Sequence, residues 1–350
     1  MDIVEKLQRL VTHFTQSPVN TAELRTYTLL RMIKAVVTRW WSELNMMRRI
    51  VDQKDALVTW AGDDDDRTEL LPDQREWLVI GDLIRMLTPV EVAGTRLGAT
   101  KTMTHSRMAF ELNEMKEGIE ATLPHLQTGE GQNAASVLLD IIFPARFGEA
   151  VPGAVPGGGG KAKKREQKIA RKLRMQMLVS AFFDLRFRTF HFLHLTEDDR
   201  VALVAEIRPA AIVEAERVLV KLKARWIPDK PAAPDAYTDG SFAAEGHHIP
   251  TAGCKTRAEA LAKEVDAYIA RKTLMPADTP DAVMLRQFEL AREQFPLLFE
   301  VAKARACIPA SSTGCERTFS KASYLWPKSR ARLSGEKVMR MLSVRDSMHS

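Results

Sequence analysis

Apolar residues recur at three- and four-residue spacing along most of this sequence. That spacing places side chains on one face of an α-helix, whereas the residues of a half-buried strand alternate with a period of two. Period-two runs of any length are hard to find, so we expect an all-α, mainly helical protein. The pattern predicts helices over residues 3–14, 29–37, 44–51, 77–87 and 105–120, the first broken at Ser17-Pro18 and the fourth ending near Pro89.

Two stretches interrupt the helical pattern. Residues 149–160 are rich in Gly and Pro, and residues 227–255 are rich in Pro, Ala, Gly and Asp. Neither composition suits a regular element, so both predict flexible segments. The helical pattern returns at Arg257 and continues to the end of the sequence.

Composition narrows the class of protein. The 350 residues are 45% hydrophobic, which is enough to bury the core of one large or two medium domains. The three cysteines, at 254, 307 and 315, form no Cys-x-x-Cys pair, which argues against a disulfide scaffold and a zinc finger. The first residues lack the apolar run of a signal peptide, and no stretch of about 18 uncharged apolar residues predicts a membrane span. We expect a reducing compartment, the cytosol or the nucleus.

Charge points to nucleic acid only weakly. The net charge of +6 permits contact with phosphates without establishing it. Basic residues gather over 161–174, where they suit a solvated helix face, a nuclear-import signal or a phosphate-binding patch. The acidic run at 63–66 is more typical of a solvated turn than of a cation site.

The last third carries the most specific motif. Residues 295–297 read Phe-Pro-Leu, residues 308–312 read Ile-Pro-Ala-Ser-Ser, residues 315–320 read Cys-Glu-Arg-Thr-Phe-Ser, and residues 332–334 read Arg-Leu-Ser. This succession resembles the terminal block of the hAT superfamily of transposases over roughly fifty residues. Cys315 stands where that family usually has Ser.

Weaker motifs extend the resemblance upstream. Thr-Arg-Trp at 38–40 is similar to a family motif, and residues 181–187 resemble its Leu-Asp-Pro-Arg-Phe, with Leu185 in place of Pro. Glu264 and Tyr268 are similar to a Glu-x-x-x-Tyr that precedes the terminal block. The tryptophan pair often found before the Phe-Pro segment is absent.

The resemblance implies a fold and an incomplete catalytic site. Transposases of this superfamily have an RNase H-like core in which two Asp and one Glu hold two metal ions. Glu316 matches the Glu, whereas neither Asp nor the family's BED zinc finger has a counterpart here. We therefore expect a helical insertion-like domain at 1–255, and at 256–350 the dimerisation region, formed by the C-terminal helices of a truncated RNase H-like core.

Three candidate residues admit a structural reading beside the functional one. Glu316 completes a Thr-x-x-Glu capping box at 313–316, and without the two Asp we favour this cap over metal binding. The resemblance implies that Trp40 stacks on a flipped base, but a core role is the more usual one beside an apolar helix. Arg39 suits a phosphate contact or an ion pair equally.

The C-terminal helices carry a basic excess and apolar faces. DNA contact is a hypothesis for Arg39, Trp40, Arg317, Lys321, Lys328, Arg330 and Arg332. The apolar residues either pack within one chain or are shared between two, and we assign dimerisation to Phe319, Leu325, Trp326, Leu333, Val338, Met341 and Leu342.

The sequence thus predicts a nuclear, transposase-derived, non-catalytic protein that acts as a homodimer or higher homo-oligomer, with sequence-tolerant DNA binding and no resident cofactor. The alternative is a subunit of an active transposase complex. In that complex Glu316 would bind Mg²⁺ or Mn²⁺ together with Asp residues from a longer partner chain.

Overall fold

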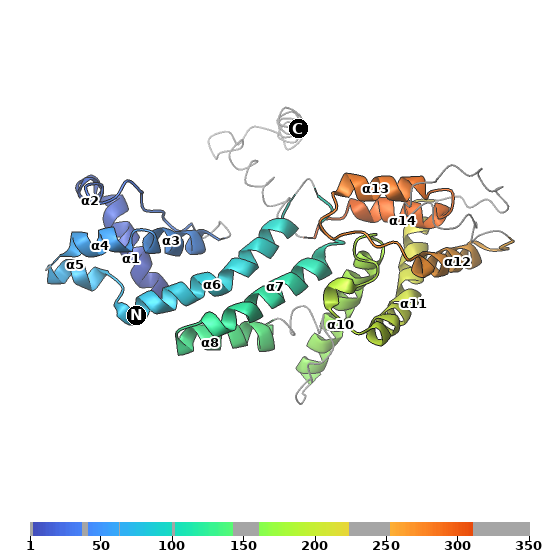
Figure 1. Cartoon of the computed structure of the whole chain (residues 1–350), viewed down its shortest axis with the longest axis horizontal. Helices are drawn as coiled ribbons and strands as arrows, with labels where there is room; N and C mark the ends of the chain where they lie inside the picture. The colour runs from blue at the N-terminus through green and yellow to red at the C-terminus, as the bar shows by residue number, and fades with distance from the viewer. Residues whose placement is uncertain are drawn as a thin grey trace, which may run out of the picture. The chain divides into compact units, whose positions relative to one another are not determined.

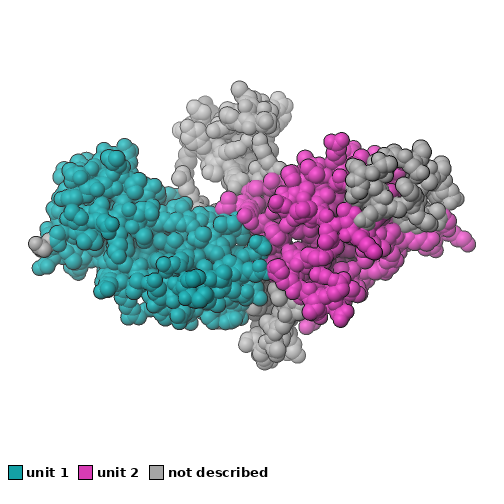
Figure 2. Space-filling model, in the orientation of Figure 1, with its two compact units in different colours: residues 1–93, 114–146 teal, residues 94–113, 147–350 magenta. Residues whose placement is uncertain are grey.

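The computed structural model describes residues 3–36, 41–62, 64–99, 102–142, 161–223 and 253–310, without the side chains of 141–142 and 161–170. Within these ranges every regular element is a helix, which confirms the all-α prediction (Figure 1). No helix among them is both long enough and apolar enough to cross a membrane. The chain divides into two compact units, unit 1 at 1–93 and 114–146 and unit 2 at 94–113 and 147–350 (Figure 2).

Unit 1 is a set of short helices around an apolar core. Four residues of α1 (Ile3–Gln16) predicted to share a face, Leu7, Leu10, Val11 and Phe14, are at most 1% exposed, which confirms that helix and its buried side. Ser17 follows α1 and caps α2 (Pro18–Leu24), accepting from the backbone N–H of Asn20 at 3.2 Å. The helices of unit 1 are α1 (Ile3–Gln16), α2 (Pro18–Leu24), α3 (Ser42–Val51), α4 (Lys54–Ala61), α5 (Asp65–Leu70), most of α6 (Gln74–Leu97) and α7 (Met108–Thr122), η1 (Leu123–His125), α8 (Gly129–Ser136) and η2 (Val137–Ile142).

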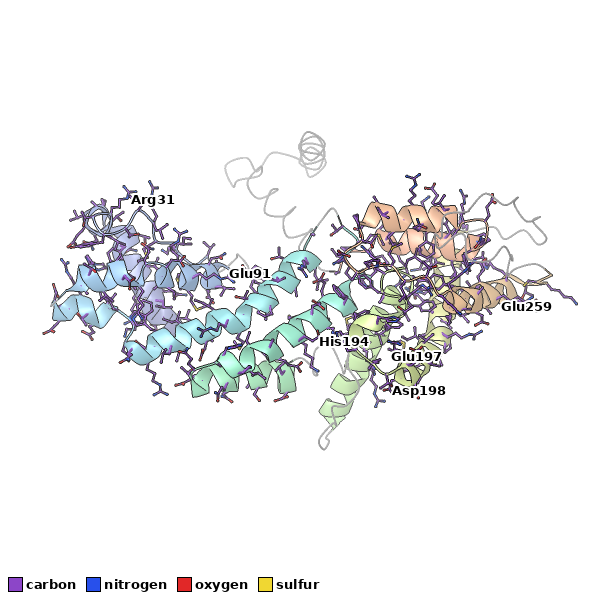
Figure 3. All side chains as sticks on the ribbon, viewed as in Figure 1. Arg31, Glu91, His194, Glu197, Asp198 and Glu259 are labelled. Atoms are coloured by element: carbon purple, nitrogen blue, oxygen red, sulfur yellow. The ribbon has the colours of Figure 1, made fainter. Side chains whose placement is uncertain are left out.

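The predicted helix over 29–37 is wrong for its described residues, 29–36, which run without helical structure from the turn after α2 toward α3. Leu29 is 96% exposed, whereas Met32 is packed against the core of unit 1, so the apolar residues of this segment do not share one buried face. Hydrogen bonds from Ser42 and Arg49 hold this backbone instead. The Ser42 hydroxyl donates to the Val36 carbonyl at 2.8 Å and accepts from the Val36 N–H at 3.0 Å, and Arg49 donates to the Arg31 carbonyl at 2.8 Å. Figure 3 labels Arg31 on this segment.

The predicted helix end near Pro89 is also wrong, because α6 continues through Pro89 to Leu97. A proline inside a helix removes one N–H bond and usually kinks or breaks the helix. Here Arg48 of α3 bonds on both sides of the proline, to Thr88 Oγ1 at 2.8 Å and to Glu91 Oε2 at 2.6 Å. These contacts hold the helix together where its own ladder is weakest.

Unit 2 surrounds an aromatic core. Phe182, Phe187, Phe190, Tyr268 and Phe295 are each at most 1% exposed. The unit joins residues on both sides of the predicted domain boundary at 255, while residues 149–160 lie outside the described part. Its described helices are α10 (Lys161–Phe182), η3 (His191–Leu193), α11 (Glu197–Lys221), α12 (Arg257–Ala270), α13 (Asp281–Leu290) and α14 (Pro296–Ala306), with the ends of α6 and α7.

Candidate functional site

The turn after α10 is the centre of a buried ion-pair network in unit 2. Arg186 donates to Asp184 through Nε at 2.9 Å and Nη2 at 2.7 Å, and both side chains are fully buried. Its Nη1 reaches Asp281 Oδ1 at 2.6 Å, at the start of α13. Ser106 donates to the second oxygen of Asp184 at 2.7 Å. Burial alone would lower the pKa of Arg186, but the bonds and charges of Asp184 and Asp281 outweigh it and raise that pKa. Arg186 therefore stays cationic and ties α10 to α13.

Arg188, two residues further along the chain, caps the C-terminal end of α12. Its Nη1 donates to the Tyr268 carbonyl at 2.9 Å, and its Nη2 to the carbonyls of Arg271 and Thr273 at 2.7 Å each. The last carbonyls of a helix have no partner within the helix and carry partial negative charge. A buried guanidinium supplies hydrogen-bond donors to these carbonyls and places a positive charge beside them.

Glu264 and Tyr268 lie one turn apart on α12 and fix two other elements. Glu264 accepts from the backbone N–H groups of Leu297 and Leu298, at 3.0 and 2.9 Å, at the first turn of α14. Burial raises the pKa of Glu264 to about 8, against the smaller opposing effect of these two bonds. The Tyr268 hydroxyl donates to the Phe182 carbonyl at 3.0 Å. Their one-turn spacing thus joins α14 and α10 through one helix.

The far end of α14 is fixed by Arg305. Its guanidinium bonds Glu214 of α11 at 2.6 Å and the hydroxyl of Ser180 on α10. Three residues beyond α14's cap, the Ala310 N–H donates to Thr104 Oγ1 at 2.8 Å. Residues 264–310 are thereby bonded to α10, α11 and the segment before α7 at several separate points.

This stretch overlaps the part of the chain that matches a known family. Residues 264–348 match the hAT family C-terminal dimerisation region. The match covers about a quarter of the chain and confirms the predicted resemblance for this region. No curated protein matches the chain.

The structure describes the matched stretch only as far as residue 310. Every residue to which we assigned a function lies outside the described part, Arg39 and Trp40 in a short gap before α3 and the rest beyond residue 310. Their roles remain predictions: Glu316, Arg317, Phe319, Lys321, Leu325, Trp326, Lys328, Arg330, Arg332, Leu333, Val338, Met341 and Leu342. Among the described residues, no three His, Cys, Asp or Glu side chains gather as a metal site would require.

Sequence reasoning found some of the residues that join residues 264–310 to the rest of unit 2, and it missed others. The hAT resemblance marked residues 181–187 and the Glu264–Tyr268 pair, and these supply the ion-pair network and the α12 bonds. It did not mark Arg188 or Arg305. Arg188 follows the Asp-x-Arg at 184–186 by two residues, and this position was the available sequence signal for it. Its partners are backbone carbonyls, however, and residue type does not identify which carbonyls these are.

Proposed function

We propose that this chain is a transposase-derived protein that acts through self-association of its hAT dimerisation region and does not itself cleave DNA. The observation that carries the proposal is the match of residues 264–348 to that region. The contacts of Arg186, Arg188, Glu264 and Arg305 support the proposal, because they hold the first half of the matched region in place. A surface that is already held in one conformation loses less conformational entropy when two chains associate.

Light scattering on the purified chain tests self-association. A monomer has a mass of 39.3 kDa, so we expect about twice that value at micromolar concentration. Trp326→Glu and Leu333→Glu, in the segment assigned to the interface, should shift the mass toward the monomer. Val19→Glu is the matched control, because Val19 is an apolar residue of unit 1 that is 75% exposed. A wild-type chain that stays monomeric contradicts the proposal.

The non-catalytic half of the proposal follows from the metal requirement. Two divalent ions need several converging carboxylates, and in this sequence the resemblance supplies only Glu316. A strand-nicking assay with Mg²⁺ or Mn²⁺ should therefore give the same background for the wild type and Glu316→Ala. Nicking by the wild type and not by Glu316→Ala would contradict the non-catalytic half of the proposal. The second candidate function, a subunit that contributes Glu316 to an active complex, instead predicts nicking only after a longer partner chain that supplies the Asp residues is added.

DNA binding and a nuclear location belong to the same proposal as secondary properties. Both rest on the basic residues at 161–174 and at 317–345. If these residues contact phosphates, affinity for duplex DNA should fall steeply and linearly on a log–log plot against salt, with little dependence on sequence. Imaging of a fluorescent fusion, with and without neutral substitutions in 161–174, tests the location.

A further inference from the structure

Helix α11 has apolar residues on two of its faces. The first face packs into unit 2 through residues that repeat every four positions and are at most 6% exposed: Leu203, Ile207, Ala211, Ala215 and Leu219. Val201, Val204 and Ala205 share a second face, because they are spaced by three and four residues. A surface helix of a globular protein usually buries a single apolar stripe, so the second stripe is a feature that the fold of unit 2 alone does not require.

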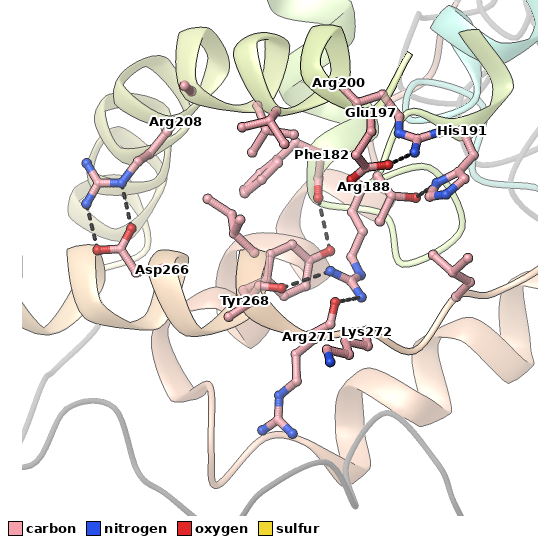
Figure 4. Close-up of a pocket in the computed structure, with 17 residues that line it drawn as sticks. Phe182, Arg188, His191, Glu197, Arg200, Arg208, Asp266, Tyr268, Arg271 and Lys272 are labelled. Atoms are coloured by element: carbon pink, nitrogen blue, oxygen red, sulfur yellow. Dashed lines mark hydrogen bonds and ion pairs between the residues drawn. The ribbon is translucent and has the colours of Figure 1, made fainter. Parts of the chain in front are cut away.

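This second face of α11 bounds a cavity of about 570 Å³ that opens between α11 and α12 (Figure 4). Its volume lies in the range of about 300–1,000 Å³ in which small-molecule sites fall. The segment that follows the α10 turn closes one side, and the residues after α12 close another. None of the residues assigned to dimerisation or DNA contact contributes to it.

The middle of the cavity is apolar. Val201 and Val204 line it from α11, and Ile269 and Leu274 line it from the end of α12 and the segment after it. Val201 is 61% and Leu274 is 55% exposed, although both lie against a hollow rather than on a convex face. Apolar surface of this kind gains free energy when a ligand removes it from water.

Two ion pairs lie at the ends of this apolar wall. Arg208 donates to Asp266 of α12 through two bonds, at 2.6 and 2.8 Å, and Arg200 pairs with Glu197 (Figure 4). The axial rise from Arg200 to Arg208 is about 12 Å, so the apolar part of the cavity suits a ligand of at most about that length.

The other cationic side chains of the lining are engaged as well. Arg188 donates to three backbone carbonyls, and Arg271 donates to Gln294 and lies over the Phe295 ring at 5.2 Å. Lys272 is not free either. A charged ligand would have to displace one of these contacts or stay unpaired in an apolar hollow, and both cost free energy. The lining therefore favours a ligand without charge.

We propose that this cavity binds a small, neutral, mainly apolar molecule that covers the second apolar face of α11. The proposal goes beyond self-association and does not depend on it. A fused ring system and a short alkyl chain share this chemistry, and the experiment separates them.

The test uses the full chain and the neutral fluorescent probe N-phenyl-1-naphthylamine, which emits more strongly in apolar surroundings. Three competitors share one ring system: 2-naphthamide is neutral, 2-naphthoate is an anion and 2-naphthylmethylamine is a cation at pH 7. We expect 2-naphthamide to displace the probe at concentrations at least tenfold lower than either ion. Displacement by 1-octanol at lower concentrations than 2-naphthamide would assign the site to alkyl chains, and the reverse would assign it to ring systems.

Variants connect the signal to the cavity. Ala205→Trp should fill the space and weaken binding of the better neutral ligand at least tenfold, because Ala205 lines the cavity. Val201→Asp should weaken it to a similar extent by placing a charge in the apolar wall. Because Val201 is 61% exposed, this variant tests the proposal even if Ala205→Trp fails to fold. Val213→Trp and Val213→Asp are the matched controls, since Val213 is on the same helix, 67% exposed and outside the lining.

Three results would overturn the proposal. The first is displacement of the probe by either ion at concentrations as low as those of 2-naphthamide. The second is unchanged binding of the neutral ligand in folded Ala205→Trp or in Val201→Asp. The third is the absence of any displacement by 2-naphthamide or by 1-octanol.

Discussion

The guanidinium of Arg186 donates to the carboxylate of Asp281 at 2.6 Å, across 95 residues of sequence. The Arg186 side chain is fully buried and that of Asp281 is 19% exposed. Because Arg186 also holds Asp184, one side chain joins the end of α10 to the start of α13, which lies in the stretch that matches the hAT dimerisation region. This contact therefore joins two segments of unit 2 that are far apart in the sequence.

Arg186→Met should destabilise unit 2 by about 3–5 kcal/mol, because it leaves the Asp184 carboxylate buried without its cation. Amide hydrogen exchange of α13 and α14 measures the loss within unit 2 alone. Arg208→Met is the matched control: its two-bond pair with Asp266 is partly exposed, so it should cost at most about 1 kcal/mol. Equal losses in the two variants would mean that burial of the Arg186 pair has no special weight.

Glu264 gives unit 2 a dependence on pH. Its pKa is about 8 in the folded chain and near 4.5 when unfolded, so the unfolded chain releases this proton first as pH rises. The free energy of unfolding should therefore fall between about pH 4.5 and pH 8, by roughly 5 kcal/mol in all, and the full contribution is present only below that window. Hydrogen exchange of α14, corrected for intrinsic rates, measures this at pH 5, 6.5 and 8.

Glu264→Gln is the control for that titration, since glutamine keeps the shape and removes the proton equilibrium. The stability of the wild type relative to this variant should decline with rising pH. Burial, with a smaller contribution from Arg305, lowers the pKa of His105, so that residue destabilises unit 2 as pH falls below its ordinary value. The His105 contribution is common to both proteins and cancels in the difference. Parallel profiles of the two proteins would refute the assignment to Glu264.

These contacts show where sequence reasoning works and where it stops. The amphipathic stripe of α1 was predictable because burial of one face and helical spacing agree. The same spacing at 29–36 failed, since the bonds of Ser42 and Arg49 to its backbone outweigh a weak local preference. The Glu264 and Tyr268 motif was visible, but its partners lie 33 and 86 residues away and are backbone groups. Such partners depend on the fold and not on residue type.

Gly131→Ala tests the packing of unit 1. A Cβ at Gly131 would lie 2.7 Å from Asp82 Cβ and Oδ2, and Asp82 is fixed because it accepts from the N–H groups of Gln127 and Thr128 at the start of α8. The substitution should cost about 1–3 kcal/mol through overpacking. Hydrogen exchange of the α8 amides, measured at increasing urea concentrations, gives the change in the free energy of unfolding of unit 1.

Gly129→Ala provides the comparison within the same helix. No atom lies within 4 Å of a Cβ at Gly129, so alanine should be neutral or slightly stabilising there. A loss at Gly129 as large as that at Gly131 would show that the effect comes from glycine's backbone freedom and not from Asp82.

Tyr268→Phe isolates the bond between α12 and the end of α10. Burial raises the pKa of Tyr268, so its hydroxyl stays protonated and donates to the Phe182 carbonyl at any working pH. Removing the hydroxyl should cost about 1–2 kcal/mol, because that buried carbonyl loses a donor, and it should leave the dimer mass unchanged. Tyr27→Phe, at a residue that is 45% exposed, should change stability by less than about 0.5 kcal/mol. If hydrogen exchange of α12 is equally protected in both variants, the Tyr268 hydroxyl does not secure α12 to the end of α10.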